Sequence, residues 1–199
     1  MSPCDCHNQT KAIAQRKVLF TLLLINGVMF VIEFGVGLYA QSTGLIADSV
    51  DMLADASVYG IAILAVGQGT LAKARAAHIS GVIQVLLAFG VIVDVVRRFL
   101  LGSEPHSTLM LLMGFAALLA NLACLALLAR HRKGEVHMRA SWVFSRNDVL
   151  ANLGVMIGGA LVAAFHSPLP DLLIGAAIAA MVMHGGISII RSAKQAASE

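Results

Sequence analysis

Residues Ser107–Ala129 read STLMLLMGFAALLANLACLALLA, a run of 23 positions without a charged side chain. About 20 mainly apolar residues suffice for a helix to cross the hydrocarbon core of a bilayer, where only helices and closed barrels pair every backbone N–H and C=O group. The run is continuous rather than alternating, which favours a helix over a barrel strand. We therefore predict that this segment is a transmembrane helix.

Five further segments have the same character: Lys17–Tyr39, Leu45–Gly69, Ala77–Leu101, Ala140–Phe165 and Asp171–Ile190. The 199-residue chain is 58% hydrophobic and 13% charged, against about 45–50% and 25% in soluble domains. The sequence thus predicts an all-α membrane protein, a single bundle of six transmembrane helices. The expected division is a flexible tail over residues 1–16, the membrane domain over 17–190 and a short tail over 191–199.

Basic residues gather on one predicted side of the membrane. Of the 14 Lys and Arg residues, 11 fall in or beside the two termini and the loops after the second and fourth spans. Cytoplasmic loops carry such an excess, so we expect both termini in the cytoplasm and the protein in the inner (cytoplasmic) membrane. This topology accounts for the net charge of +3, and it leaves no reason to expect a nucleic-acid partner.

The N-terminal tail contains the run Cys4-Asp5-Cys6-His7. Short Cys/His tracts can bind metal. A cytoplasmic location argues against a disulfide between the two cysteines. We favour the simpler interpretation, a terminus whose cysteines and histidine are incidental.

Three carboxyl groups lie inside the second span, at Asp48, Asp51 and Asp55. With 3.6 residues per turn they share one face of a helix. Charged side chains at membrane depth are costly and are therefore candidates for function. Three ionised acids would repel one another, and a divalent cation with its preference for hard oxygen ligands removes that repulsion. The alternative is a helix lining a hydrated cavity in which some of the acids stay protonated.

The fifth span supplies a facing candidate, Asp148. It shares its helical face with Ser145 and Asn152, whereas Asn147 points about 100° away. The alternative for Asp148 is an ion pair with Arg146 or a hydrogen bond to a neighbouring helix. We take Asp148 as the strongest ligand candidate of the set.

Other polar residues inside the spans are weaker candidates. Asn26 and Glu33, seven positions apart, share a face of the first span and could line an access route. Asp94 could pair with one of the two arginines that follow it. His184 is more economically explained as a hydrogen-bonded packing residue than as a ligand, and its alternative role is in a proton relay.

Six spans with an Asp-x-x-x-Asp pair in the second and an Asp in the fifth resemble the cation diffusion facilitator family of metal/proton antiporters. The resemblance runs through the whole membrane part. It includes the Ser42–Asp48 approach to the acid pair, Asn121 in the fourth span, Met138-Arg139-Ala140 before the fifth, and Pro170-Asp171 opening the sixth.

This resemblance implies a mid-membrane metal site built from two residues of the second span and two of the fifth. Asp51, Asp55 and Asp148 match three of the four positions. The fourth, commonly His or Asp in the family, is Phe144, which cannot coordinate a cation. An oxygen-rich shell would suit harder ions such as manganese, iron(II) or cobalt. It would be completed by Asp48, Ser145, Asn152 or a water molecule.

The implied function is efflux of a divalent metal ion (zinc, iron, manganese, cobalt or cadmium) in exchange for protons. The metal is the transported substrate, and no prosthetic group is expected. The family's usual C-terminal domain and His-rich loop have no counterpart in this sequence, so we expect a homodimer to form through the spans. A degenerate relative that binds metal or a partner transporter without transporting is the second hypothesis. We do not expect the protein to be an enzyme, since the sequence shows no nucleophile and base in a credible catalytic arrangement.

Overall fold

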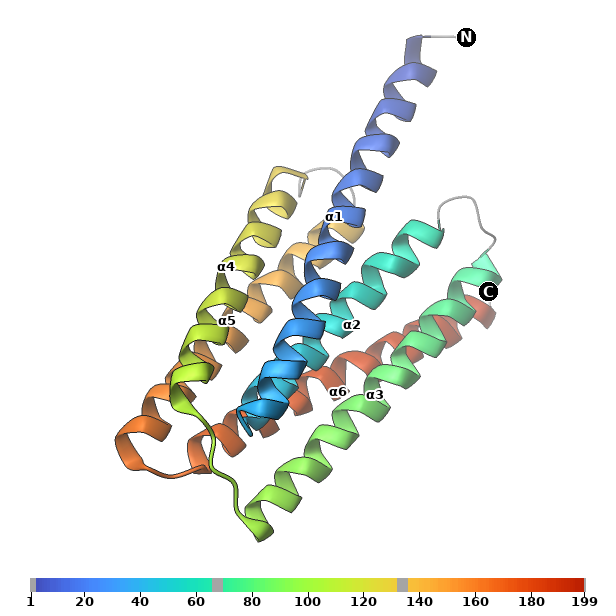
Figure 1. Cartoon of the computed structure of the whole chain (residues 1–199). Helices are drawn as coiled ribbons and strands as arrows, with labels where there is room; N and C mark the ends of the chain where they lie inside the picture. The colour runs from blue at the N-terminus through green and yellow to red at the C-terminus, as the bar shows by residue number, and fades with distance from the viewer. Residues whose placement is uncertain (1–2, 66–69, 132–135, 199) are drawn as a thin grey trace.

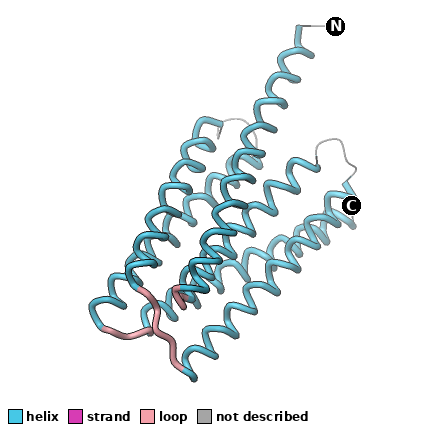
Figure 2. The backbone as a smooth tube through the Cα atoms, in the orientation of Figure 1, coloured by secondary structure: helices cyan, strands magenta, loops and turns pink. Residues whose placement is uncertain are grey.

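Six helices make up the computed structural model, which describes the backbone of residues 3–65, 70–131 and 136–198. The side chains of residues 1–15, 65–70, 72–73, 130–146 and 197–199 lie outside the described part. The helices are α1 (Pro3–Tyr39), α2 (Thr43–Ala65), α3 (Thr70–Leu101), α4 (Ser107–His131), α5 (Val136–Phe165) and α6 (Leu169–Ser198) (Figure 1). Helices joined by short loops account for the described chain (Figure 2). The predicted all-α bundle of six helices is confirmed.

Both terminal helices are longer than the spans predicted for them. Helix α1 begins at Pro3, inside the segment that we expected to be a flexible tail, and its first turns project beyond the other helices (Figure 1). Helix α6 continues past Ile190 to Ser198. The expected ends of the spans at Tyr39, Leu101 and Phe165 coincide with helix ends.

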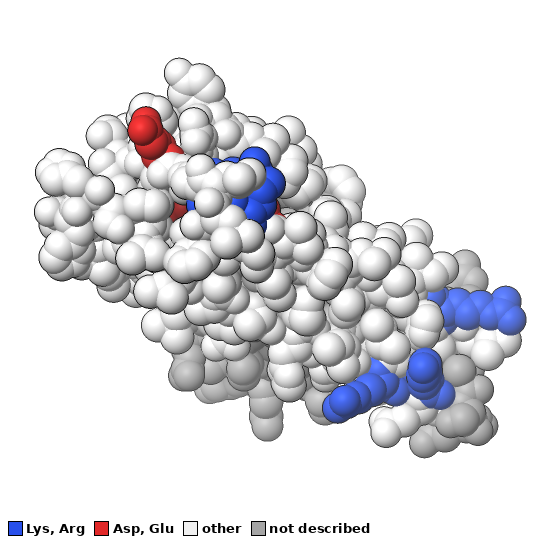
Figure 3. All heavy atoms as spheres, turned by 90° about the horizontal axis from the view of Figure 1, so that it is seen from below, with Lys and Arg blue, Asp and Glu red and all other residues white. Residues whose placement is uncertain are grey.

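The outer surface of the bundle is apolar, as a lipid environment requires. Large side chains such as Leu101 and Leu173 are 79% and 70% exposed. In the face shown in Figure 3, basic side chains gather in two separate regions with mostly uncharged surface between them. Within the described residues, five helices contain a segment long and apolar enough to cross a membrane. These segments are Arg16–Tyr39, Ala74–Leu101, Ser107–Ala129, Asn147–Phe165 and Leu169–Ala196.

Helix α2, which carries the three acids, is the centre of the bundle. It contacts each of the other five helices. In the part of the chain that the structure describes, α3 contacts only α2 and α6. The long helices α3 and α6 lie side by side (Figure 1). The neighbours of α2 therefore screen its carboxyl groups from lipid, which removes the main cost of placing them at membrane depth.

The N-terminal end of α2 is fixed to α6 by Asp171, whose side chain is fully buried. One carboxylate oxygen accepts hydrogen bonds from the Ser42 hydroxyl (2.7 Å) and the Gly44 N–H (2.9 Å), and the other accepts from the Thr43 N–H (2.7 Å). Asp171 thus caps α2 from another helix, satisfying backbone donors that the first turn leaves unpaired. A Cβ at Gly44 would lie 2.9 Å from the Asp171 carboxylate, so this approach requires glycine.

A second close approach between α2 and α6 lies one turn further along, at Gly175. A Cβ there would meet the backbone carbon and oxygen of Thr43 at 2.9 Å. Backbone atoms cannot move aside as a flexible side chain can, so the clash of about 1–3 kcal/mol exceeds the roughly 1 kcal/mol that alanine gains over glycine in a helix. We expect Gly175→Ala to lower the melting temperature of the detergent-solubilised protein by a few degrees.

Gly185→Ala is the matched control on the same helix, because nothing lies within 4 Å of a Cβ at that position. Its melting temperature is expected to stay unchanged or to rise slightly. Equal destabilisation by both substitutions would show that the close approach at Gly175 does not matter.

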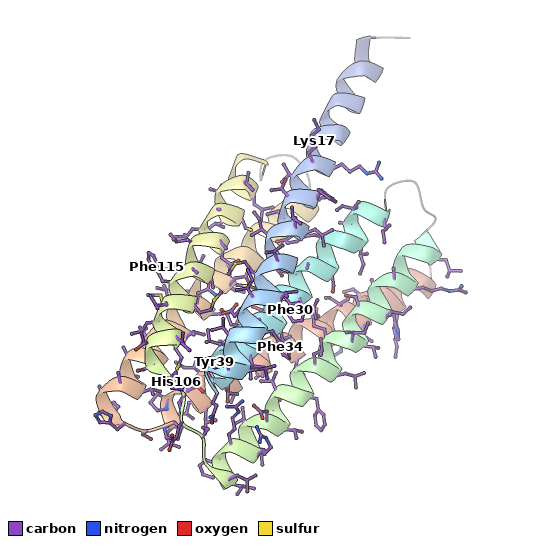
Figure 4. The ribbon with its side chains drawn as sticks, in the orientation of Figure 1. Lys17, Phe30, Phe34, Tyr39, His106 and Phe115 are labelled. Carbon is purple, nitrogen blue, oxygen red and sulfur yellow. The ribbon has the colours of Figure 1, made fainter. Side chains whose placement is uncertain are left out.

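Near the N-terminal end of α2, further polar contacts come from α3 and from the loop that follows α3. Asp94 pairs with Arg97 (2.7 Å) and Arg98 (2.5 Å), which confirms the predicted ion pair. The Arg98 guanidinium also donates to the backbone carbonyl of Gln41, in the turn between α1 and α2. Next to this turn the rings of Tyr39 and His106 stack with centroids 6.4 Å apart (Figure 4). These contacts join α3 to the turn between α1 and α2, and the end of α1 to the loop before α4.

Candidate metal centre

A cavity of about 720 Å³ lies between α2, α3, α5 and α6. Most of its wall is apolar, and its acidic residues are Asp51 and Asp55 from α2 and Asp148 from α5. Leu150 and Met181 also line it and are 59% and 45% exposed, so the cavity reaches the outer surface beside α5 and α6. The three acids chosen from the sequence as ligand candidates thus share one cavity.

Asp55 and Asp148 approach each other from different helices. Their carboxyl groups are within hydrogen-bonding range, and the Tyr59 hydroxyl donates to Asp55 at 3.2 Å. Two carboxylates this close repel one another unless a proton or a cation lies between them. Asp51, one turn before Asp55, faces the same cavity. The arrangement can therefore exchange a proton for a metal ion at one place.

Asp48 is turned away from this cavity. Its side chain is 1% exposed and accepts a 2.5 Å hydrogen bond from the Asn152 amide. The Asn152 oxygen in turn accepts from the Asn121 amide at 2.9 Å, so one polar chain joins α2, α5 and α4. Neither Asp48 nor Asn152 lines the cavity, and the expectation that one of them completes the metal shell is not supported.

The single acidic stripe expected on α2 is therefore divided. Asp48 and Asp51 are about 60° apart around a helix. Because α2 is surrounded by five helices, this angle is enough for Asp48 to face α5 and its asparagine while Asp51 faces the cavity.

Comparison with known proteins identifies the bundle. Residues 19–75 and 72–196 match the family model described as the cation efflux transmembrane domain. The chain belongs to the cation efflux family. The match includes part or all of each of the six helices, and the resemblance to cation diffusion facilitators is confirmed.

Relatives of this cation efflux chain include two bacterial proteins named as antiporters and one named as a zinc transporter. A protein from Bacillus subtilis named cadmium, cobalt and zinc/H(+)-K(+) antiporter is 23% identical, over 93% of this chain and 64% of its own length. Its namesake from Bacillus velezensis is also 23% identical, over 93% of this chain and 63% of its own. Zinc transporter ZitB of Yersinia pseudotuberculosis is 28% identical, over 73% of this chain and 51% of its own. The chain spans about half to two thirds of the length of these relatives.

The acids of this cation efflux protein do not converge on one point. Among the described side chains, no three His, Cys, Asp or Glu residues lie close enough together to hold a metal ion. Asn147, which we expected to point away, lines the cavity beside Asp148. Binding by three carboxylates would therefore require α2 and α5 to move closer together around the ion. The helical-wheel angle missed Asn147 because the cavity is wider than one helical face.

Several expectations fall outside the described side chains of this cation efflux protein. These are Phe144 at the fourth ligand position, Ser145 and Arg146 beside it, and the N-terminal Cys4, Cys6 and His7. The alternative ion pair between Arg146 and Asp148 also involves a side chain, that of Arg146, outside the described part.

Three weaker candidates lie differently from what the sequence suggested. Asn26 is 2% exposed and its amide donates to the Leu22 carbonyl (3.0 Å) and the Cys124 sulfur (3.7 Å). Glu33 is fully buried, so neither residue lines an access route. His184 is exposed and lines the cavity from α6, so its expected role as a packing residue is wrong.

Proposed function

We propose that this protein exports a divalent metal ion from the cytoplasm in exchange for protons. The observation that carries the proposal is that Asp55 and Asp148, from two helices, lie close together in one cavity that Asp51 also lines. Family membership supports the same activity. In this account the three carboxylates bind the ion when deprotonated, and protons entering from outside displace it, because a proton and a metal ion compete for the same oxygen atoms.

The ligand set favours ions that accept oxygen donors. Carboxylates, with Asn147 in the same cavity wall, suit manganese, iron(II) and cobalt as well as zinc and cadmium. The names of the Bacillus and Yersinia relatives support zinc, cobalt and cadmium as candidates. We propose that the transported ion comes from this group.

Alternating access follows from how α2 is held. The N-terminal end of α2 is fixed to α6 through Asp171, while the part of α2 that carries Asp51 and Asp55 faces a cavity bordered by α5. Movement of α5 against α2 and α6 would bring Asp148, which already lies beside Asp55, toward Asp51 as an ion binds. A ligand shifts such an equilibrium only through its different affinity for the two states, and closure of the three ligands supplies that difference.

Topology and assembly complete the proposal. We place both termini in the cytoplasm of the cell, with the protein in the inner membrane, because the basic residues gather beside the termini and two loops. We also propose a homodimer formed through the spans.

Transport by the wild-type protein in proteoliposomes tests the function. Vesicles are prepared with a pH gradient and loaded with a metal-sensitive dye, and cadmium, zinc, cobalt, manganese or iron(II) is added outside. We expect metal uptake that depends on the gradient and stops when an ionophore collapses it. Vesicles that take up none of these ions would rule out metal/proton antiport.

The second candidate function is metal binding without transport, and Phe144 favours it because phenylalanine offers no ligand at the fourth position. Restoring a ligand by Phe144→His separates the two. If the wild type transports, we expect the histidine variant to shift selectivity toward zinc, since imidazole is a softer ligand than a carboxylate. A silent wild type that becomes active with histidine would instead support the non-transporting alternative.

A further inference from the structure

Glu33 on α1 is a fully buried acid outside the metal cavity. Its side chain is 0% exposed, and neither carboxyl oxygen has a hydrogen-bond partner among the described residues other than a neighbouring acid. A buried carboxylate without donors is costly, by several kcal/mol or more. An apolar side chain at position 33 would carry no such cost, so the buried carboxyl group needs an explanation.

The acid next to Glu33 is Asp48, which is within hydrogen-bonding range of it. Asp48 is at the same time the end of the amide chain through Asn152 and Asn121. The two asparagines fix one side of the Asp48 carboxyl group, and the other side meets Glu33. Neither acid can donate a hydrogen bond to the other unless one of them carries a proton.

The charges around this pair are all negative or absent. Helix α2 contributes Asp51, one turn from Asp48, and Asp148 on α5 acts on Asp48 from across the bundle. Among the described residues, α4 contributes the Cys124 thiol, which meets Asn26 two turns before Glu33, and the uncharged Asn121. No described Lys or Arg side chain bonds either acid. A proton is therefore the charge-compensating partner that fits a pair of fully buried acids.

We propose that Glu33 and Asp48 form a proton site that is separate from the metal cavity and serves the exchange reaction. The inference rests on the proposed antiport. One carboxyl oxygen carries the proton as an O–H group and the other acid accepts the hydrogen bond. When a metal ion enters beside Asp51, its positive charge repels the proton, the O–H bond breaks, and the proton passes to water. A proton from the outer side restores the O–H bond when the metal has left.

Proton release on metal binding tests the site. Calorimetric titration with cadmium or zinc in buffers of different ionisation enthalpy gives the number of protons released per metal ion. We expect about two protons for the wild type, one from the Asp55–Asp148 pair and one from Glu33 and Asp48. Glu33→Gln is expected to release about one proton fewer while metal affinity changes by less than about threefold.

Asp48→Asn is the second variant, because an amide oxygen at position 48 can still accept the Asn152 hydrogen bond. It should lose the same proton. Glu104→Gln, the same chemical change at an exposed residue, should release as many protons as the wild type.

The outcomes separate this inference from the proposed function. Unchanged proton release in Glu33→Gln and Asp48→Asn would overturn the separate proton site, since all protons would then come from the metal ligands. Folded variants that no longer bind metal would also overturn it, because the pair would belong to the metal site. A wild type that binds none of the metals would refute the proposed function itself.

Discussion

Metal transport is expected to stop when Asp148 is replaced by asparagine. Asp148 is the acid that α5 contributes to the cavity, and it meets Asp55 of α2 there. Asparagine has almost the same volume but no charge, so the packing of α5 is preserved while the electrostatic attraction for a dication falls. Loss of residues that merely support metal ligands weakens binding 10- to 100-fold, so we expect a loss on the order of 100-fold or more for a ligand itself.

The measurement is the initial rate of metal uptake in proteoliposomes at equal protein content. Asp94→Asn is the matched control: it removes an acid from α3 that is paired with Arg97 and Arg98 and does not line the cavity. The control should transport at close to the wild-type rate. Wild-type transport by Asp148→Asn would mean that the ion passes elsewhere.

The largest effect on stability is expected from Asp171→Ala. The substitution leaves the Thr43 and Gly44 N–H groups and the Ser42 hydroxyl without their acceptor in a buried position. Unsatisfied buried donors cost about 1–3 kcal/mol each, so a loss of about 3 kcal/mol or more is expected. For a chain of this size that corresponds to a fall in melting temperature of roughly 6–12 °C.

Thermal unfolding of the detergent-solubilised protein measures this effect. Asp171→Asn should lie between the wild type and Asp171→Ala, because an amide oxygen still accepts hydrogen bonds but carries no charge. Glu104→Ala, at an exposed glutamate near the same end of the bundle, should change the melting temperature little. Equal stability of Asp171→Ala and the wild type would contradict the capping role.

The fold was predictable because membrane helices leave strong signals. Continuous apolar segments such as Ser107–Ala129 must be helical in lipid, and short loops leave little freedom in joining them. The ends of α1 and α5 at Tyr39 and Phe165 were also correct. The start of α1 was not predictable in the same way, because the polar composition before residue 17 carries no membrane signal, and the structure begins α1 at Pro3.

The candidate site was only partly predictable. The cavity contains Asp51, Asp55 and Asp148 as the motif suggested. A helical wheel could not separate Asp48 from Asp51, because the separation depends on which neighbouring helix each one faces. It likewise excluded Asn147, which the width of the cavity includes.

Glu33 shows the same limit. Its position on α1 gave no hint that it would meet Asp48, since that contact depends on how two helices pack. The orphaned carboxyl group became visible only when burial and hydrogen bonding were known together.

The central claim is that Asp51, Asp55 and Asp148 bind a divalent ion between α2 and α5. It is tested most directly by calorimetric titration of the purified protein with manganese, iron(II), cobalt, zinc and cadmium, repeated on Asp51→Ala and on Asp148→Ala. We expect binding of at least one ion by the wild type, and its loss in both variants. Binding that survives both substitutions would contradict the claim, because the ion would then lie outside the cavity.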